Sequence, residues 1–159
     1  MEQALPTASP SDEVPAPQPG STRLPLYLSL AYLVLISYAS LYPLANWRDL
    51  GVPPLAFVDA AWPRYWTVFD LSVNILAYLP LGFLLSLALR GLPGGRWSAA
   101  IIALLLGSLL SLALECLQNW LPTRVPSNLD LACNAVGTAI GAVLAFCTGK
   151  RIFRRIGQI

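Results

Sequence analysis

The side chains of this sequence that could do chemistry lie on three predicted helices and on the loop that joins the last two. They are Asp70, Asn74, Tyr78, Glu115, Gln118, Arg124, Asp130 and Asn134. The first three are four residues apart and therefore share one stripe of a helix. Carboxylates, amides and one guanidinium gathered in one place suit two kinds of chemistry. They can hydrogen-bond a polar headgroup, or a desolvated carboxyl group among them can transfer protons.

Arg124 is the expected partner of two of these carboxylates. If the helix that carries Glu115 runs to Leu121, this carboxylate lies about 9 Å inside the end of the helix. An ionised carboxylate at that depth costs about 2–3 kcal/mol unless it is paired or hydrated. Because Pro122 turns the chain back over the bundle, we predict that Arg124 bridges Glu115 and Asp130.

A pair of glycines indicates which way the last polar residues face. Gly137 and Gly141 form a GxxxG pattern, which lets a neighbouring helix backbone approach closely. Asp130 and Asn134 lie on the same helix face, so they also point toward the interior of a bundle. The spacing leaves open whether the glycines serve a contact within the chain or a homodimer.

The composition of the chain lies outside the range of soluble globular proteins, and this indicates what kind of elements position these residues. Of 159 residues, 56% are hydrophobic and 11% charged, and the mean hydropathy is +0.62. A net charge of +2 is too small for a nucleic-acid binder. The absence of histidine excludes His-based metal sites and Ser-His-Asp or Cys-His catalysis. We therefore assign no metal, no cofactor and no nucleic-acid partner.

Uncharged stretches long enough to cross a bilayer dominate the chain. They cover residues 24–47, 71–89, 97–114 and 131–149. The five tryptophans lie at or beyond the ends of these stretches, as expected for aromatic belts at the membrane interfaces. The sequence therefore predicts an all-α integral membrane protein with four transmembrane helices, and a 46–69 connection that lies along the membrane surface, where it could include a short interfacial helix.

The basic residues predict the orientation of these helices. One side of the membrane would carry Arg23, Arg90, Arg96, Lys150, Arg151, Arg154 and Arg155. The other side would carry only Arg48, Arg64 and Arg124. Under the positive-inside rule both termini are cytoplasmic, in a multi-pass protein of the cell inner (plasma) membrane. Residues 1–22 are Pro-rich and are predicted to be a disordered tail, residues 24–149 form the membrane domain, and residues 150–159 form a basic cytoplasmic tail.

Two motifs resemble those of a known family. The first runs D-x3-N-x3-Y-L-P-L-G-F from Asp70, and the second runs E-x2-Q-x5-R-x5-D-x3-N-x2-G-x3-G from Glu115. At these positions the chain resembles the VanZ-like membrane protein family, over about residues 30–147. Many family members have Lys after the Asp and His at the position of Asn74, whereas this sequence has Leu71 and Asn74. The resemblance implies a role in glycopeptide (teicoplanin) resistance and assigns no catalytic residue.

Three functions are compatible with these residues. The first is a protein that binds or modulates an envelope component, with membrane lipid, a cell-wall intermediate or a glycopeptide as partner. The second is a small membrane enzyme with Glu115 as general acid or base, or with Asp70 and Asp130 sharing a hard cation. The third is a four-span transporter. A purely structural clasp of the same polar residues is an alternative to all three, and self-association of the chain stays open.

Overall fold

The computed structural model describes the backbone of residues 23–156 and the side chains of residues 23–148. Its helices are α1 (Leu24–Leu41), α2 (Val68–Ala88), α3 (Gly95–Gln118) and α4 (Asn128–Ile156), with a short 3-10 turn η2 (Leu89–Gly91) after α2. No strand occurs in this part of the chain. The proposed disordered tail, residues 1–22, lies outside the described residues, as do the side chains of the proposed basic tail, 150–159.

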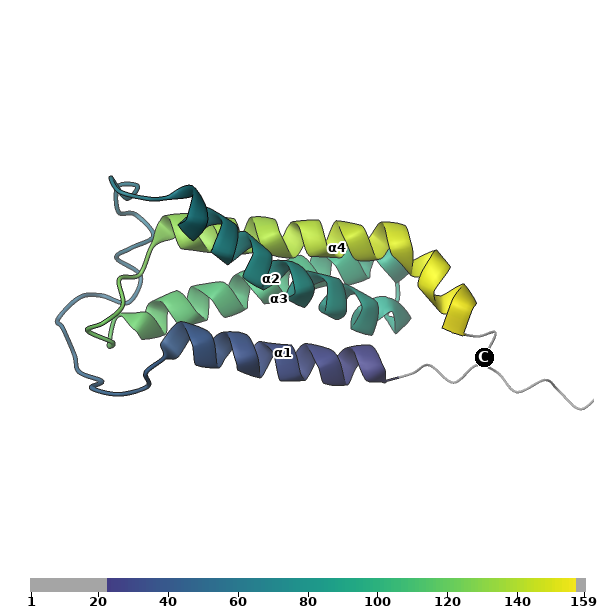
Figure 1. Cartoon of the computed structure of the whole chain (residues 1–159), viewed down its shortest axis with the longest axis horizontal. Helices are drawn as coiled ribbons and strands as arrows, with labels where there is room; N and C mark the ends of the chain where they lie inside the picture. The colour runs from purple at the N-terminus through teal and green to yellow at the C-terminus, as the bar shows by residue number, and fades with distance from the viewer. Residues whose placement is uncertain (1–22, 157–159) are drawn as a thin grey trace, which may run out of the picture.

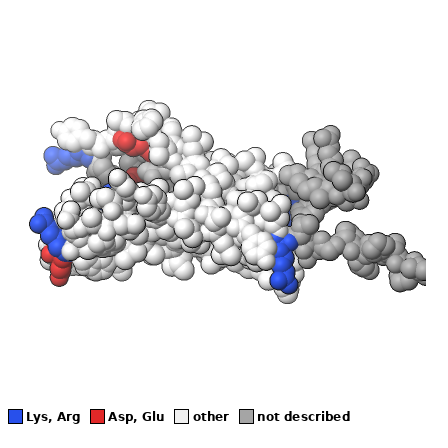
Figure 2. All heavy atoms as spheres, turned by 60° about the horizontal axis from the view of Figure 1, so that its bottom comes forward, with Lys and Arg blue, Asp and Glu red and all other residues white. Residues whose placement is uncertain are grey.

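All four helices are long and apolar enough to cross a membrane, which confirms the predicted fold class. They lie side by side along the longest axis of the molecule, and two long connections, 42–67 and 119–127, meet at one end (Figure 1). Figure 2 shows charged side chains near the two ends of the face in view, and a broad uncharged band between them. The predicted orientation, with both termini cytoplasmic, stays a prediction.

The helix ends differ from the predicted spans for local reasons. Helix α1 stops at Leu41, well before residue 47, because Tyr42 precedes Pro43 and is held extended (φ −60°, ψ 135°). Helix α2 begins before residue 71, because Thr67 and Asp70 form a reciprocal capping box. Helix α4 begins at Asn128 and continues past the predicted end at residue 149.

The closest helix contact joins α2 to α4 through glycines. A Cβ atom added to Gly137 would overlap the backbone carbonyl of Ile75, and one added to Gly141 would overlap the carbonyl of Leu79. Gly82 of α2 faces the backbone of Thr138 in the same way. The GxxxG pattern thus serves a contact within the chain, where the absence of side chains lets two backbones touch.

Helix α1 is attached differently: within the described residues it contacts α2 and α3 but not α4. Midway along it, the Tyr32 hydroxyl donates a hydrogen bond of 3.0 Å to the Ala77 carbonyl. Its remaining polar attachments lie at its C-terminal end, next to the polar residues described below.

The 46–69 connection lies across that same end of the bundle. It consists of successive turns, so the short helix considered for it does not form. The backbone N–H of Arg48 donates to the Trp120 carbonyl at 3.0 Å, and the side chains of Asn119 and Asn128 donate to the carbonyls of Pro54 and Ala60. These bonds tie the connection to the end of α3 and the start of α4.

Candidate functional site

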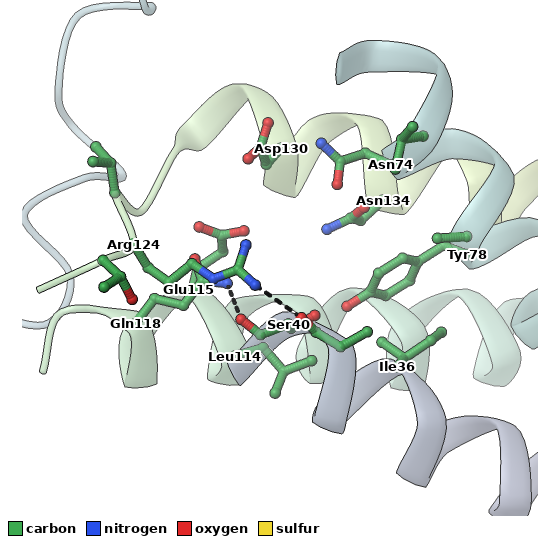
Figure 3. A pocket seen from close by; sticks show the side chains of 15 residues that line it. Ile36, Ser40, Asn74, Tyr78, Leu114, Glu115, Gln118, Arg124, Asp130 and Asn134 are labelled. Carbon is green, nitrogen blue, oxygen red and sulfur yellow. Dashed lines mark hydrogen bonds between the residues drawn. The ribbon is translucent and has the colours of Figure 1, made fainter. Parts of the chain in front are cut away.

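A pocket of about 370 Å³ opens at the end of the bundle where the two long connections meet. It lies between the C-terminal turns of α1 and α3, the N-terminal halves of α2 and α4, and the segment 123–125 (Figure 3). Every polar residue singled out in the sequence except Asp70 lines it. They are Asn74, Tyr78, Glu115, Gln118, Arg124, Asp130 and Asn134. The apolar part of the wall comes from residues such as Ile36 and Leu114.

Arg124 does not bridge the two carboxylates, so that prediction was wrong. Its Nε and Nη2 atoms donate to the Tyr42 carbonyl at 3.3 and 3.2 Å, and Nη2 also donates to the Ala39 carbonyl at 3.0 Å. The Gln118 amide donates to the Ser40 carbonyl at 3.0 Å, and Figure 3 draws the bonds that reach Ala39 and Ser40 at the end of α1. The physical reason is that the last carbonyls of a helix have no intrahelical donor, and a cation is favoured at that end.

Glu115 is bound by the start of α4 instead. Its Oε2 atom accepts a hydrogen bond of 2.9 Å from the backbone N–H of Ser127, and the side chain is only 4% exposed. Ser127 in turn caps α4, because its hydroxyl accepts from the N–H groups of Leu129 and Asp130. A helix N-terminus favours a carboxylate, so Glu115 is satisfied without a cationic partner. Since α3 ends at Gln118 rather than Leu121, Glu115 also lies in the last turn, nearer the end than predicted.

Asn134 forms the floor of the pocket and keeps one free acceptor. Its Nδ2 donates to the Ser111 hydroxyl at 2.9 Å, and its backbone carbonyl accepts from the Thr138 hydroxyl at 2.8 Å. Its Oδ1 atom is buried and has no hydrogen-bond partner. A buried acceptor without a partner costs about 1–3 kcal/mol, which a bound donor would recover.

Two further polar groups face the pocket without a bond to the protein. Within the described residues no hydrogen bond involves the side chain of Asn74 or Asp130, and Figure 3 shows both across the pocket from α1. Asp70 shares a helix stripe with Asn74 and Tyr78 but does not line this pocket. Its carboxylate accepts from the Thr67 N–H and hydroxyl at 2.9 and 2.7 Å. Asp70 lines an adjoining groove instead.

Sequence reasoning missed the contribution of α1 and of Ser127. The Ser127-x2-Asp130 spacing before an apolar run is a helix-start signal that could have located the cap. For α1 the available signal was Pro43, which ends the helix and leaves carbonyls for other residues to bond. Between residues 23 and 148 no group of three or more His, Cys, Asp or Glu side chains is placed to hold a metal ion.

The fold and the pocket define a class, a four-helix membrane protein with a polar site at one end of the bundle. A family model described as VanZ/LLP1 matches residues 17–153, so the chain belongs to the VanZ/LLP1 family. This confirms the resemblance seen in the two motifs. Comparison with curated proteins and with solved structures gave no match.

Proposed function

We propose that this protein binds a polar component of the cell envelope in the pocket between its four helices, and thereby modulates the envelope's response to glycopeptides such as teicoplanin. The observation that carries the proposal is the set of acceptors without protein partners, on Asn74, Asp130 and Asn134, that line one pocket. A structural clasp alone would be expected to satisfy its own polar groups. Groups left unbonded are instead suited to a ligand.

The distribution of basic residues supports a plasma-membrane protein with this pocket on the extracytoplasmic side. Arg90 and Arg96 lie at the opposite end of the bundle, next to the carbonyls of Ala145 and Phe146. With those arginines in the cytoplasm, the pocket opens among outer-leaflet headgroups and within reach of cell-wall intermediates.

The test is a susceptibility assay on cells that depend on this protein, scored together with its level in the membrane. Asp130→Asn and Asn74→Leu are expected to abolish the glycopeptide phenotype at normal protein level, because neither side chain bonds to the protein. Asp59→Asn is the matched control, since it removes the same charge from the 46–69 connection, away from the pocket. An unchanged phenotype in both pocket variants would contradict the proposal.

A small membrane enzyme is the second candidate, and one observation favours it. Two carboxyl groups in different environments line the same pocket, with Glu115 buried beside a helix N-terminus and Asp130 partly exposed. Such a pair can divide acid and base roles. Turnover of a lipid-linked or peptidyl substrate by pure protein, lost in Glu115→Gln, would support this candidate. A transporter has less support, because the pocket lies at one end of the bundle rather than at its middle.

A further inference from the structure

We infer that the pocket, with the groove outside it, selects an ammonium-bearing ligand rather than a phosphate or carboxylate. This inference rests on the proposed function, since it names the chemical class that the same pocket would take. An ammonium group has donors only, so it seeks acceptor oxygens and aromatic faces.

The pocket continues into an outer groove of about 390 Å³. Both are lined by Asn74, Arg124 and Asp130, so these residues stand where the two spaces meet. A ligand in the groove can therefore extend a short polar group past Asp130 toward Glu115 and Asn134.

Acceptors dominate the lining of this continuous space. Asp70 lines the groove, Glu115 lines the pocket and Asp130 lines both, whereas Arg124 is the single cation among the lining residues. Nε and Nη2 of that guanidinium already donate to the carbonyls at the end of α1. An anion would meet carboxylates and a guanidinium whose Nε and Nη2 are already bonded, whereas a cation would meet the carboxylate of Asp130, which forms no hydrogen bond within the described residues.

An independent observation places a specific acceptor at the bottom of the pocket. Asn134 is only 4% exposed, and its Oδ1 is the buried side-chain polar atom without a partner in the described residues. A donor from the ligand would satisfy this atom, and an anion would not.

Aromatic rings complete the chemistry on the outer side. Tyr65, Trp66 and Phe69 line the groove, and their side chains are 95%, 55% and 75% exposed. The face of an aromatic ring attracts ammonium groups, most strongly for tryptophan. Carboxylates and ring faces along one groove therefore suit an amine at its entrance as well as at its base.

The ammonium group can come from a lipid headgroup or from a soluble amine, and the test separates these sources. The full chain is placed in nanodiscs of mixed phosphatidylethanolamine and phosphatidylglycerol, and the lipid that stays bound is measured by native mass spectrometry. Soluble ethylamine, with ethanol as its uncharged control and inorganic phosphate as the anion, is titrated against the intrinsic tryptophan fluorescence.

We expect phosphatidylethanolamine to be retained over phosphatidylglycerol, and Asp130→Asn to lower that preference about tenfold, the loss of one charge-assisted hydrogen bond. Trp66→Leu is expected to lower it by a smaller factor. Asp59→Asn and Trp62→Leu are the matched controls, because neither residue lines the pocket or the groove, and both should bind as the wild type does.

Binding of ethylamine alone would assign a soluble amine, and binding of phosphatidylethanolamine alone would assign the lipid headgroup. Either result supports the inference. Preference for phosphatidylglycerol or phosphate would overturn the inference and leave the proposed function standing with an anionic ligand. No binding of any probe, together with a normal glycopeptide phenotype in Asp130→Asn, would overturn both.

Discussion

Helix α4 and helix α1 are attached to the bundle in opposite ways. Helices α2 and α4 meet backbone to backbone over Gly137 and Gly141, with no side chain between them. Helix α1 is held by hydrogen bonds from Tyr32, Gln118 and Arg124, two of which also line the pocket. The α2–α4 contact depends on the absence of side chains at the glycines, whereas the attachment of α1 depends on particular polar groups. Changes at the first should therefore affect folding alone, whereas changes at the second can affect both folding and binding.

The largest effect is expected where a side chain is added between α2 and α4. In Gly141→Ala the new Cβ would overlap the Leu79 carbonyl and lie 2.7 Å from the Phe83 nitrogen, so the helices must separate. We expect a loss of about 3 kcal/mol in the free energy of unfolding, measured in mixed micelles. Gly91→Ala is the control, since nothing lies within 4 Å of its added Cβ. Equal stability of the two variants would show that the α2–α4 contact is not close.

The next effect concerns the C-terminal attachment of α1. Arg124→Leu removes the donors to Ala39 and Tyr42, and should lower stability by about 2–3 kcal/mol because bonds from a charged group are lost. Hydrogen exchange over residues 36–44 should rise in the same variant. The stability of Arg124→Lys should lie between that of the wild type and that of Arg124→Leu, since an ammonium point charge replaces the forked donors of the guanidinium. A change no larger than that of Arg48→Leu would indicate that α1 is held by apolar packing.

A smaller effect is expected midway along α1. Tyr32→Phe removes the hydroxyl that donates to the Ala77 carbonyl and should cost about 1 kcal/mol. Tyr27→Phe provides a matched comparison, because Tyr27 is exposed and its hydroxyl forms no hydrogen bond in the described structure. If both variants unfold at the same denaturant concentration, this bond contributes nothing.

The smallest effect on stability is expected at Asp130, where the comparison becomes a test of function. Asp130→Asn breaks no hydrogen bond within the described residues and changes only a charge near the start of α4, so stability should fall by less than about 1 kcal/mol. The preference for an ammonium-bearing ligand should nevertheless fall about tenfold, and the glycopeptide phenotype should be lost. A variant that unfolds instead would make Asp130 a structural residue.

The sequence was sufficient to predict the helices and most of the pocket, and insufficient to predict the partners of the charged groups. Hydropathy located all four helices, and helical spacing grouped Asn74 with Tyr78 and Asp130 with Asn134. The prediction that Arg124 pairs with carboxylates was wrong because its guanidinium binds backbone carbonyls instead. Every residue carries such a carbonyl, and no sequence pattern marks the ones that will be bound. Those carbonyls became available only because Pro43 ends α1 at Leu41.

The glycine face of α4 has a consequence for self-association. Because α2 of the same chain covers Gly137 and Gly141, a second copy of the protein has no access to that face while the chain is folded. Any homodimer must therefore form through another surface, and a substitution that weakens it should leave the α2–α4 contact intact. Self-association and folding are thereby separable in this protein, although the GxxxG pattern is one often used for dimers.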